Sequence, residues 1–384
     1  MKVGIDMDFI FEIAFRLIIT MILAFLLTPL IRKLAFKINA VDQPSKRRIN
    51  KTPMPTAGGL AIYIAFSFSI LVLFPDVMPF NFALHLVISS GIVVITGLID
   101  DIFEISPRQK LIGVVLAALY VCFVFDITVQ SITLPYIGHI PLTWLSYPIT
   151  ILWIVGLTNA VNLIDGLDGL ASGISIIALS TIGIIGYIGS STGAVKIQVP
   201  LAIFILLMSA LGFFPFNFYP AKLYLGDTGA LFLGFMISVL SIQGLKNATV
   251  ISLITPLIIL GVPITDTLFA MIRRTLNKKP ISSADKMHLH HRLISLGFTH
   301  RGAVLTIYGM AMIFSLIALL YMFTNTWATI LLSIACLFGL QIFIELIGLT
   351  GVENQPLLDS FKFLGNKAYR DQRIKERKEK KNKR

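Results

Sequence analysis

The fold is decided by the stretch "LSYPITILWIVGLTNAVNLIDGLDGLASGISIIALSTIGIIGYI", which runs from Leu145 to Ile188. It holds two apolar segments, 145–163 and 170–188. Each is close to the ~20 residues with which a helix crosses the hydrocarbon core of a membrane. Between them, residues 159–169 carry asparagines, aspartates and glycines. Hydrocarbon offers such polar groups no hydrogen-bond partner, so the stretch predicts two transmembrane helices joined by a polar turn at one membrane surface.

The same pattern recurs along the whole chain. Of its 384 residues, 56% are apolar and only 14% are charged, with a mean hydropathy of +0.84, which excludes a soluble globular protein. The sequence predicts an all-α polytopic membrane protein with eleven transmembrane helices, at 9–31, 58–75, 83–99, 109–125, 145–163, 170–188, 199–216, 229–245, 249–272, 303–323 and 327–348. The first is not expected to be a cleavable signal peptide, because Glu12 and Arg16 interrupt it.

The basic residues indicate the orientation. With the N-terminus outside, the cytoplasmic segments are 32–57, 100–108, 159–169, 217–228, 273–302 and a tail from 349. Together with Lys110, these segments hold 28 of the 32 lysines and arginines. This asymmetry is the positive-inside pattern, so we expect a cytoplasmic C-terminus. Residues 1–348 are then one membrane domain, and 349–384 are interpreted as a basic, solvated tail.

The net charge of +12 therefore belongs to the cytoplasmic face, where anionic lipid and phosphate-bearing ligands are the expected partners, and not nucleic acid. Cys122 and Cys336 each lie in an apolar segment, which argues against a disulfide framework. The sequence contains no Walker A motif and no G-x-G-x-x-G motif, so an ATP-driven pump or a dinucleotide enzyme is unsupported.

Two acidic motifs lie at cytoplasmic helix ends. In "GLIDDIF", Asp100 and Asp101 repel each other unless a cation such as Lys or Mg²⁺ lies beside them. Arg108 and Lys110 follow in one short loop and favour a phosphate or metal site, with a water-exposed pair at a helix end as the alternative. In "LYLGDTG", Asp227 either caps the next helix or faces a phosphate through a cation.

The polar turn at 159–169 also has two interpretations. If the helix continues to Ile164, Asn159 and Asn162 lie one turn apart, and Asp165 is next on the same stripe. Capping of helix ends accounts for one or two polar residues, whereas this turn has four, so ligand binding is favoured. Asp168 faces the next helix and is the one that best fits a structural role.

A further segment is rich in imidazoles. Four of the six histidines are His288, His290, His291 and His300. On a helix, His288, His291 and Arg292 would share one face, and Leu289, Leu293 and Leu296 would share another. A zinc site is only weakly supported, because no cysteine lies nearby.

The sequence allows two interpretations for each of two other charged residues, Asp266 and Lys51. Asp266 forms an ion pair with Arg273 and Arg274, or binds a ligand. Lys51, before a Pro-rich turn, belongs to a phosphate site or is one more positive-inside charge.

All these groups gather at one membrane face, which suits Mg²⁺-assisted chemistry on a phosphate substrate. A coupled transporter is the rival class, but it would place ionisable groups near the bilayer midplane, often in inverted repeats. The acids here lie at one face, and the sequence has no visible repeat. A lipid-binding scaffold would not need three separate aspartate motifs.

Taken together, the sequence resembles the polyprenyl-phosphate N-acetylhexosamine-1-phosphate transferases (glycosyltransferase family 4). The resemblance is carried by "PTAGG", "GLIDD", "NAVNLIDGLDGLA", "NFYPAKLYLGDTGALFLG", "PITDTLFAMIRR" and "HLHHRL", in the family's order between about Val41 and Phe298. It implies transfer of GlcNAc-1-phosphate from UDP-GlcNAc to undecaprenyl phosphate, giving undecaprenyl-diphosphate-GlcNAc and UMP. It also implies Mg²⁺, with Mn²⁺ as a substitute, tunicamycin sensitivity, and an active site on the cytoplasmic face of a bacterial plasma membrane. "AVDQPS" and "LNKKPIS" are most similar to members that begin teichoic acid synthesis; a homodimer stays open.

The resemblance also implies roles by motif position. Asp227 would bind Mg²⁺, with Asp100 and Asp101 beside the reacting phosphates as further catalytic and metal-binding groups, and Asp100 would handle the proton of the lipid phosphate. Lys51 and Lys110 would bind phosphate, and Tyr224 would stack on uracil. The residues implied to face the nucleotide are Asn159, Asn162, Asp165, Asp168 and Asn217, with Asp165 catalytic. Those implied to hold the diphosphate and amino sugar are His288, His290, His291 and Arg292, with His290 and His291 catalytic.

This chain departs from the related peptidoglycan-precursor enzymes at two places. Leu289 interrupts their continuous histidine run, and Glu104 stands where they tend to have Lys. Both departures favour GlcNAc over the larger MurNAc-pentapeptide. The chemistry expected is direct attack of the lipid phosphate on the diphosphate, with a covalent aspartyl intermediate as the alternative.

Overall fold

The computed structural model describes residues 7–43, 53–134, 138–243, 257–276, 288–324, 326–347 and the single residues 357 and 363. The chain divides into two compact units, one of Met1–Thr265 with His300–Phe323 and one of Asp266–Thr299 with Thr324–Arg384. The predicted boundary at residue 348 and, apart from residues 357 and 363, the basic tail 349–384 lie outside the described residues.

Most of the described chain is helical. The helices of the first unit are α1 (Met7–Lys37), α2 (Gly59–Phe68) continued by the π-helix η1 (Ser69–Leu73), α3 (Phe80–Phe103), α4 (Pro107–Phe123), the 3₁₀ turn η2 (Thr143–Leu145), α5 (Ser146–Ile164), α6 (Leu170–Ser191), α7 (Gln198–Asn217), α8 (Gly226–Gln243), α12 (His300–Leu320) and the 3₁₀ turn η3 (Tyr321–Phe323). The helix α10 (Gly261–Leu276) crosses the division at residue 265. The second unit contains α11 (Leu289–Ser295) and α13 (Thr326–Ile347).

Eight helices among the described residues are long and apolar enough to cross a membrane. Their bounds are Asp8–Lys37, Phe80–Phe103, Thr143–Ile164, Leu170–Ser191, Gln198–Asn217, Gly226–Gln243, His300–Phe323 and Trp327–Glu345. Each overlaps one of the helices that the sequence predicts, so a multi-pass helical membrane protein is confirmed.

The predicted count of eleven is not confirmed. The segment 58–75 forms α2 and η1, which are apolar but shorter, over Gly59–Leu73. The segment 109–125 forms α4, which has 17 residues. The segment 249–272 is described only from residue 257, and α10 begins at Gly261.

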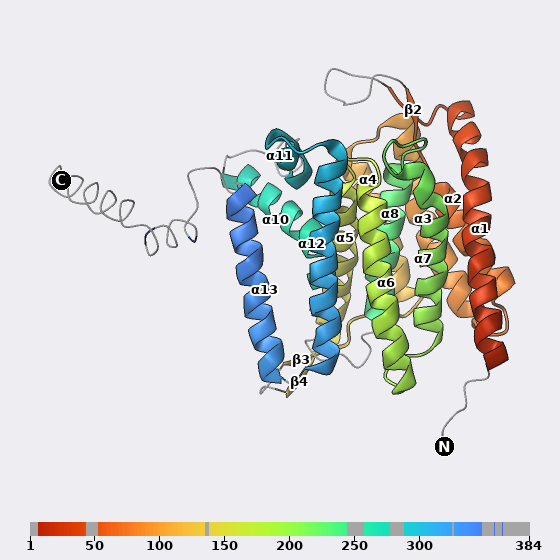
Figure 1. The fold of residues 1–384 in the computed structure, drawn as a ribbon. Helices are drawn as coiled ribbons and strands as arrows, with labels where there is room; N and C mark the ends of the chain where they lie inside the picture. The colour runs from red at the N-terminus through yellow and green to blue at the C-terminus, as the bar shows by residue number, and fades with distance from the viewer. Residues whose placement is uncertain are drawn as a thin grey trace. The chain divides into compact units, whose positions relative to one another are not determined.

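The helix α8 is the centre of the first unit. It packs along α5 and α3 and also contacts α2 and α6 (Figure 1). Within the protein, 83% of its apolar stretch is buried. A helix that is apolar on all sides is expected in such a central position. By contrast, only 11% of the corresponding stretch of α1 is buried, and α1 packs mainly against α7.

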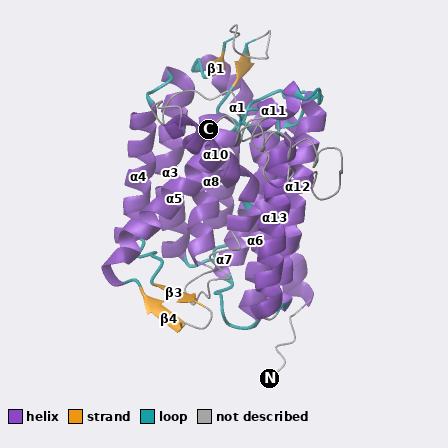
Figure 2. Ribbon diagram, turned by 90° about the vertical axis from the view of Figure 1, so that its left-hand side faces the viewer, coloured by secondary structure: helices purple, strands orange, loops and turns teal. Residues whose placement is uncertain are grey.

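In the part of the chain that the structure describes, two short antiparallel ribbons are the exception to the predicted all-α fold. Figure 2 shows them at opposite ends of the helices: β1 (Val41–Asp42) pairs with β2 (Met54–Pro55), and β3 (Ser131–Leu134) pairs with β4 (Gly138–Pro141). The β2 strand in turn binds the loop before α8, because Tyr224 N–H donates to Pro55 O at 2.9 Å. Strands of two to four residues are too short to produce a readable alternation in the sequence.

Glycines allow α2, α3 and α8 to meet backbone to backbone at the start of α8. A Cβ added to Gly59 would lie 2.0 Å from the Cα of Gly229, and one added to Gly97 would lie 2.5 Å from the Cα of Thr228. Neither obstacle is a side chain that could rotate away. The glycines of "PTAGG" and "GLIDD" are therefore required by packing at this junction.

We expect Gly59→Ala to lower the free energy of unfolding by about 3 kcal/mol, because the added methyl group overpacks a contact with rigid backbone. The control is Gly156→Ala in α5, where an added Cβ has nothing within 4 Å. Thermal unfolding of both purified variants in detergent measures the difference, and equal melting temperatures would contradict the packing argument.

Candidate active site

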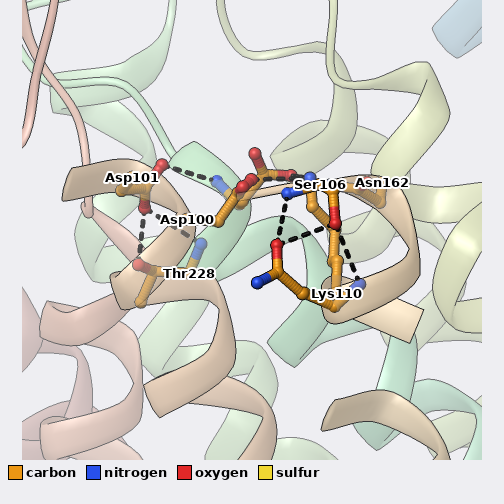
Figure 3. Close-up of polar contacts among 8 residues, drawn as sticks. Asp100, Asp101, Ser106, Lys110, Asn162 and Thr228 are labelled. Carbon is orange, nitrogen blue, oxygen red and sulfur yellow. Dashed lines mark hydrogen bonds and ion pairs between the residues drawn. The ribbon is translucent and has the colours of Figure 1, made fainter. Parts of the chain in front are cut away.

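The first turn of α8 is capped by a carboxylate from α3. Asp101 Oδ1 accepts the N–H of Asp227 at 3.0 Å, and Asp101 Oδ2 accepts the N–H of Thr228 at 3.0 Å and its hydroxyl at 2.5 Å (Figure 3). The first amides of a helix have no partner within the helix, and an anion there is favoured by the helix dipole. The cap that the sequence considered for Asp227 is thus supplied by Asp101.

The neighbouring carboxylate, Asp100, points to a different partner. Lys110 Nζ lies 2.6 Å from Asp100 Oδ2 and 2.9 Å from Asp227 Oδ1, so one ammonium joins the two carboxylates. Asn162 Nδ2 donates to the same Oδ1 of Asp227. Four residues from α3, α4, α5 and α8 therefore converge. Of the cations that the sequence suggested beside "GLIDD", the structure places the Lys110 ammonium there.

The divergence of Asp100 and Asp101 follows from helix geometry. Successive residues on an α-helix point about 100° apart, so adjacent carboxylates cannot face one ligand equally. Asp100 is 7% exposed, and its oxygen turns to Lys110, while Asp101 turns to α8. The acidic pair is divided between two partners.

Lys110 is positioned by the local sequence between α3 and α4. Glu104 adopts a left-handed conformation (φ 48°) at the end of α3. Ser106 and Gln109 form a capping box, in which the Ser106 N–H donates to Gln109 Oε1 at 2.9 Å. Pro107 occupies the first turn of α4, where its missing N–H costs nothing. The helix therefore starts close after α3, and Lys110 lies one turn into it.

The turn 165–169 brings a further acid to the site. Asp165 follows the last residue of α5 and is half-buried. Its burial and the neighbouring carboxylates, Asp227 foremost, raise the pKa of Asp165 well above its usual range. Asn159, by contrast, donates to Val155 O in its own helix at 2.7 Å.

Asp168 joins three segments of the first unit. Its Oδ2 accepts the N–H of Ala221 at 3.0 Å, and its own N–H donates to His300 Nε2 at 3.1 Å. The His300 ring also lies against Tyr219, with centroids 4.7 Å apart. These contacts support the structural interpretation of Asp168 and join the turn to the loop 218–225 and to α12.

Asn217 lies beneath this loop and is 2% exposed. Its Oδ1 accepts the Ser172 hydroxyl at 2.6 Å, and its Nδ2 donates to Leu223 O at 3.1 Å. Both ends of the amide are therefore engaged in holding the loop. Tyr308 of α12 adds a hydrogen bond to Gly169 O.

Ser172, His300 and Tyr308 were not predicted as parts of the site. Each contacts a residue far along the chain: Ser172 the side chain of Asn217, His300 the backbone N–H of Asp168, and Tyr308 the carbonyl of Gly169. Only the glycine spacing of "DGLDGLASG" hints at a close approach. Gly173 is where Tyr308 fits, since an added Cβ there would lie 2.0 Å from its hydroxyl oxygen.

Two predicted residues, Tyr224 and Lys51, remain to be located. Tyr224 is half-buried in the loop before α8, and its carbonyl accepts the N–H of Gly58 at 2.9 Å. Lys51 lies outside the described residues.

The histidine segment belongs to the second unit. Asp266, 2% exposed in α10, has its Oδ2 2.8 Å from His288 Nδ1 and accepts the Leu289 N–H through Oδ1 at 2.9 Å. His288 and His290 stack in parallel with centroids 5.9 Å apart. Asp266 is thus paired with His288. The side chain of Arg273, one of the two arginines that the sequence suggested as partners, lies outside the described residues.

The predicted amphipathic helix over this segment is partly wrong. Helix α11 has only seven residues, so it cannot present one face from residue 288 to 296. His288 precedes it in extended conformation and is buried, whereas His291 is exposed. Of the three leucines predicted to share a face, Leu289 and Leu293 are buried, but Leu296 lies beyond the helix end and is 49% exposed.

The acidic site of the first unit fits a magnesium ion. Among the described residues, no group of three or more His, Cys, Asp or Glu side chains is arranged to hold a metal. Mg²⁺, however, commonly takes one or two carboxylates and completes its shell with water and substrate phosphate. Asp100 and Asp227 already hold a cation, the Lys110 ammonium, between their oxygens. Asp101 fits less well, since both of its oxygens accept bonds from α8.

The chain is similar to known transferases, and the matched family model includes the residues of the acidic site. The family model of glycosyl transferase family 4 matches residues 83–245. The chain is 38% identical to the probable undecaprenyl-phosphate N-acetylglucosaminyl 1-phosphate transferase of Bacillus subtilis (strain 168), over 92% of this chain and 97% of that protein. It is 32% identical to the decaprenyl-phosphate N-acetylglucosaminephosphotransferase of Mycolicibacterium smegmatis, over 75% and 76% of the two chains. It is 29% identical to the phospho-N-acetylmuramoyl-pentapeptide-transferase of Halalkalibacterium halodurans, over 81% and 96%.

The first of these relatives is similar across nearly the full length of both chains, and the family model covers the segment that carries Asp100, Lys110, Asn162 and Asp227. The chain belongs to glycosyl transferase family 4.

The raised pKa of Asp165 predicts a pH dependence of folding stability. The folded protein holds this proton more tightly than the unfolded chain, whose aspartates titrate near ~4, so stability falls as pH rises from that value through the raised pKa. We expect Asp165→Asn to raise the melting temperature in EDTA at pH 8, with the gain shrinking toward pH 4. Thermal unfolding across this range measures the gain. Asp126→Asn, at an exposed aspartate, is the control, and parallel curves for all three proteins would contradict the prediction.

Proposed function

We propose that the protein transfers GlcNAc-1-phosphate from UDP-GlcNAc to undecaprenyl phosphate, giving undecaprenyl-diphosphate-GlcNAc and UMP. The observation that carries this proposal is the 38% identity, across nearly the whole chain, to a probable transferase of this specificity. The convergence of Asp100, Lys110, Asn162 and Asp227 supports it, because phosphoryl transfer depends mainly on positioning and charge neutralisation.

The reaction is an in-line displacement at the β-phosphorus of UDP-GlcNAc. An oxygen of the lipid phosphate forms the new bond to this phosphorus, and the bond from phosphorus to the bridging oxygen breaks. UMP leaves with that electron pair, and the sugar keeps its anomeric bond. A phosphate monoester has its second pKa near ~6, so the lipid phosphate is largely dianionic at neutral pH and needs little help from a base. Asp100 is the residue proposed to take any remaining proton.

Asp227 and Asp100 are the residues proposed to hold Mg²⁺, with Mn²⁺ as a substitute. The bound ion would neutralise charge on the diphosphate. Lys110 already contacts both carboxylates and is within reach of the same ligand region. The family resemblance groups Asp101 with these two metal ligands.

The remaining assignments rest on the resemblance. Those proposed for the nucleotide are Asn159, Asn162, Asp165, Asp168 and Asn217, with Tyr224 stacked on uracil. Lys51 is proposed to bind phosphate. Those proposed for the diphosphate and amino sugar are His288, His290, His291 and Arg292.

The setting proposed is the plasma membrane of a bacterium, with the active site at the cytoplasmic face and the product used in teichoic acid or related wall polymer synthesis. The orientation is supported by the placement of 28 of 32 basic residues in the predicted cytoplasmic segments. Eleven spans and a homodimer belong to the same proposal.

The activity is tested with purified protein, UDP-GlcNAc and undecaprenyl phosphate in detergent. We expect UMP release that requires the lipid, stops in EDTA and is blocked by tunicamycin. Asp227→Asn should lower kcat about 100-fold or more, because it removes a carboxylate proposed to hold the Mg²⁺ that would neutralise charge on the diphosphate. Asp126→Asn should leave kcat unchanged, and a panel of UDP-sugars should show preference for UDP-GlcNAc. Full activity of Asp227→Asn would remove the metal assignment.

Direct displacement and a mechanism with a covalent aspartyl intermediate predict different products when undecaprenyl phosphate is absent. With UDP-GlcNAc labelled in the sugar and no lipid acceptor, direct displacement predicts no UMP burst and no label on the protein. Rapid quenching followed by mass spectrometry of the intact protein measures both. Detection of a sugar phosphate attached to Asp100 or Asp227 would contradict direct displacement and support the covalent mechanism.

A further inference from the structure

The adjacent carboxylates Asp100 and Asp101 have different surroundings. Asp100 binds an ammonium that also binds Asp227. Asp101 accepts three hydrogen bonds, two from backbone amides and one from a hydroxyl, all at the first turn of α8. Figure 3 shows Asp101 directed to Thr228 on one side, while Lys110 and Asn162 lie together on the other.

The sequence of α8 leaves it no cap of its own. Its first residue is Gly226, which has no side chain, and the chain enters the helix through a left-handed conformation there (φ 70°). A Cβ at Gly226 would lie 2.6 Å from Asp101 Oδ2. Glycine at this position therefore makes room for the carboxylate of α3, which satisfies amides that would otherwise lack a partner.

One of these amides belongs to Asp227 itself. The bond from Asp227 N–H to Asp101 Oδ1 fixes the backbone from which the Asp227 carboxylate extends to Lys110 and Asn162. A partner that orients a ligand in this way commonly affects metal affinity by 10- to 100-fold.

We infer that Asp101 is a positioning residue: it caps α8 from the neighbouring helix and so holds Asp227 opposite Asp100 and Lys110, instead of binding the metal ion itself. The inference deepens the proposed function and rests on it only for the activity measurement. Thr228, 0% exposed, is the partner through which it can be tested without altering a carboxylate.

The test compares Thr228→Val, which keeps the shape but removes the hydroxyl, with Thr228→Ser, which keeps the hydroxyl. Ser238→Ala is the matched control, because it removes a buried hydroxyl of the same helix, which donates to Phe235 O at 2.7 Å. For each protein, the melting temperature is measured in EDTA and then during a titration with MgCl₂. These measurements need no substrate.

We expect Thr228→Val to lower the melting temperature in EDTA and to raise the Mg²⁺ concentration for half-maximal stabilisation about 10-fold, since the cap is weakened and Asp227 loses its orientation. Thr228→Ser should lie within about 2-fold of wild type, and Ser238→Ala should leave the Mg²⁺ midpoint unchanged. Asp101→Asn should shift both quantities in the same direction as Thr228→Val. If Asp101→Asn does not fold, the Thr228 pair still decides.

A metal-binding Asp101 predicts the opposite result. Loss of the Thr228 hydroxyl would then free an oxygen of Asp101, and the Mg²⁺ midpoint of Thr228→Val would stay the same or fall. That outcome overturns the inference. If wild-type protein binds Mg²⁺ but does not consume UDP-GlcNAc, the proposed function fails while the midpoints still test the role of Asp101.

Discussion

The capped N-terminus of α8 is the constraint on which the first unit depends. A buried helix end leaves several amide donors without partners, and each unsatisfied donor costs free energy in a medium of low dielectric constant. The Asp101 carboxylate satisfies two of these amides from α3. The close approach that this requires is possible because Gly59, Gly97 and Gly226 have no Cβ. The position of α2, α3 and α8 is thus fixed at the same point where Asp227 enters the site.

The same junction concentrates negative charge. Asp100, Asp101 and Asp227 lie within one set of hydrogen bonds and ion pairs. The charges of Asp227 and Asp101, after burial, raise the pKa of Asp165. Lys110 offsets part of this repulsion. A site that gathers carboxylates beyond its internal cations is less stable than a neutral one, and such a cost is common where function requires the charge. The surplus is the feature that makes a divalent cation a suitable ligand here.

The sequence predicted the eight long helices and the turn at 159–169 because both depend on local patterns, apolar length and its interruption. It did not predict which partner each acid would have. Asp101 and Thr228 are 127 positions apart, and nothing local to "GLIDD" marks one acid for α8 and the other for Lys110. The prediction of an amphipathic helix over the histidine segment was partly wrong for a related reason. Helical periodicity assumes a continuous helix, and α11 is too short to include His288 and Leu296.

The aspartates of the sequence motifs fall into two groups according to the partners that they bind. These partners explain the role of each aspartate better than the spacing of the motifs does. Asp101, Asp168 and Asp266 each accept backbone N–H groups from a distant segment, at residues 227 and 228, 221 and 289 respectively. A carboxylate with such partners holds two segments together. Asp100 and Asp227 instead contact side chains that can exchange for a ligand or an ion. In "DD" and in "DGLDG", one acid of each pair, Asp101 or Asp168, thus binds the backbone of a distant segment. The other, Asp100 or Asp165, lies among the charged side chains of the site.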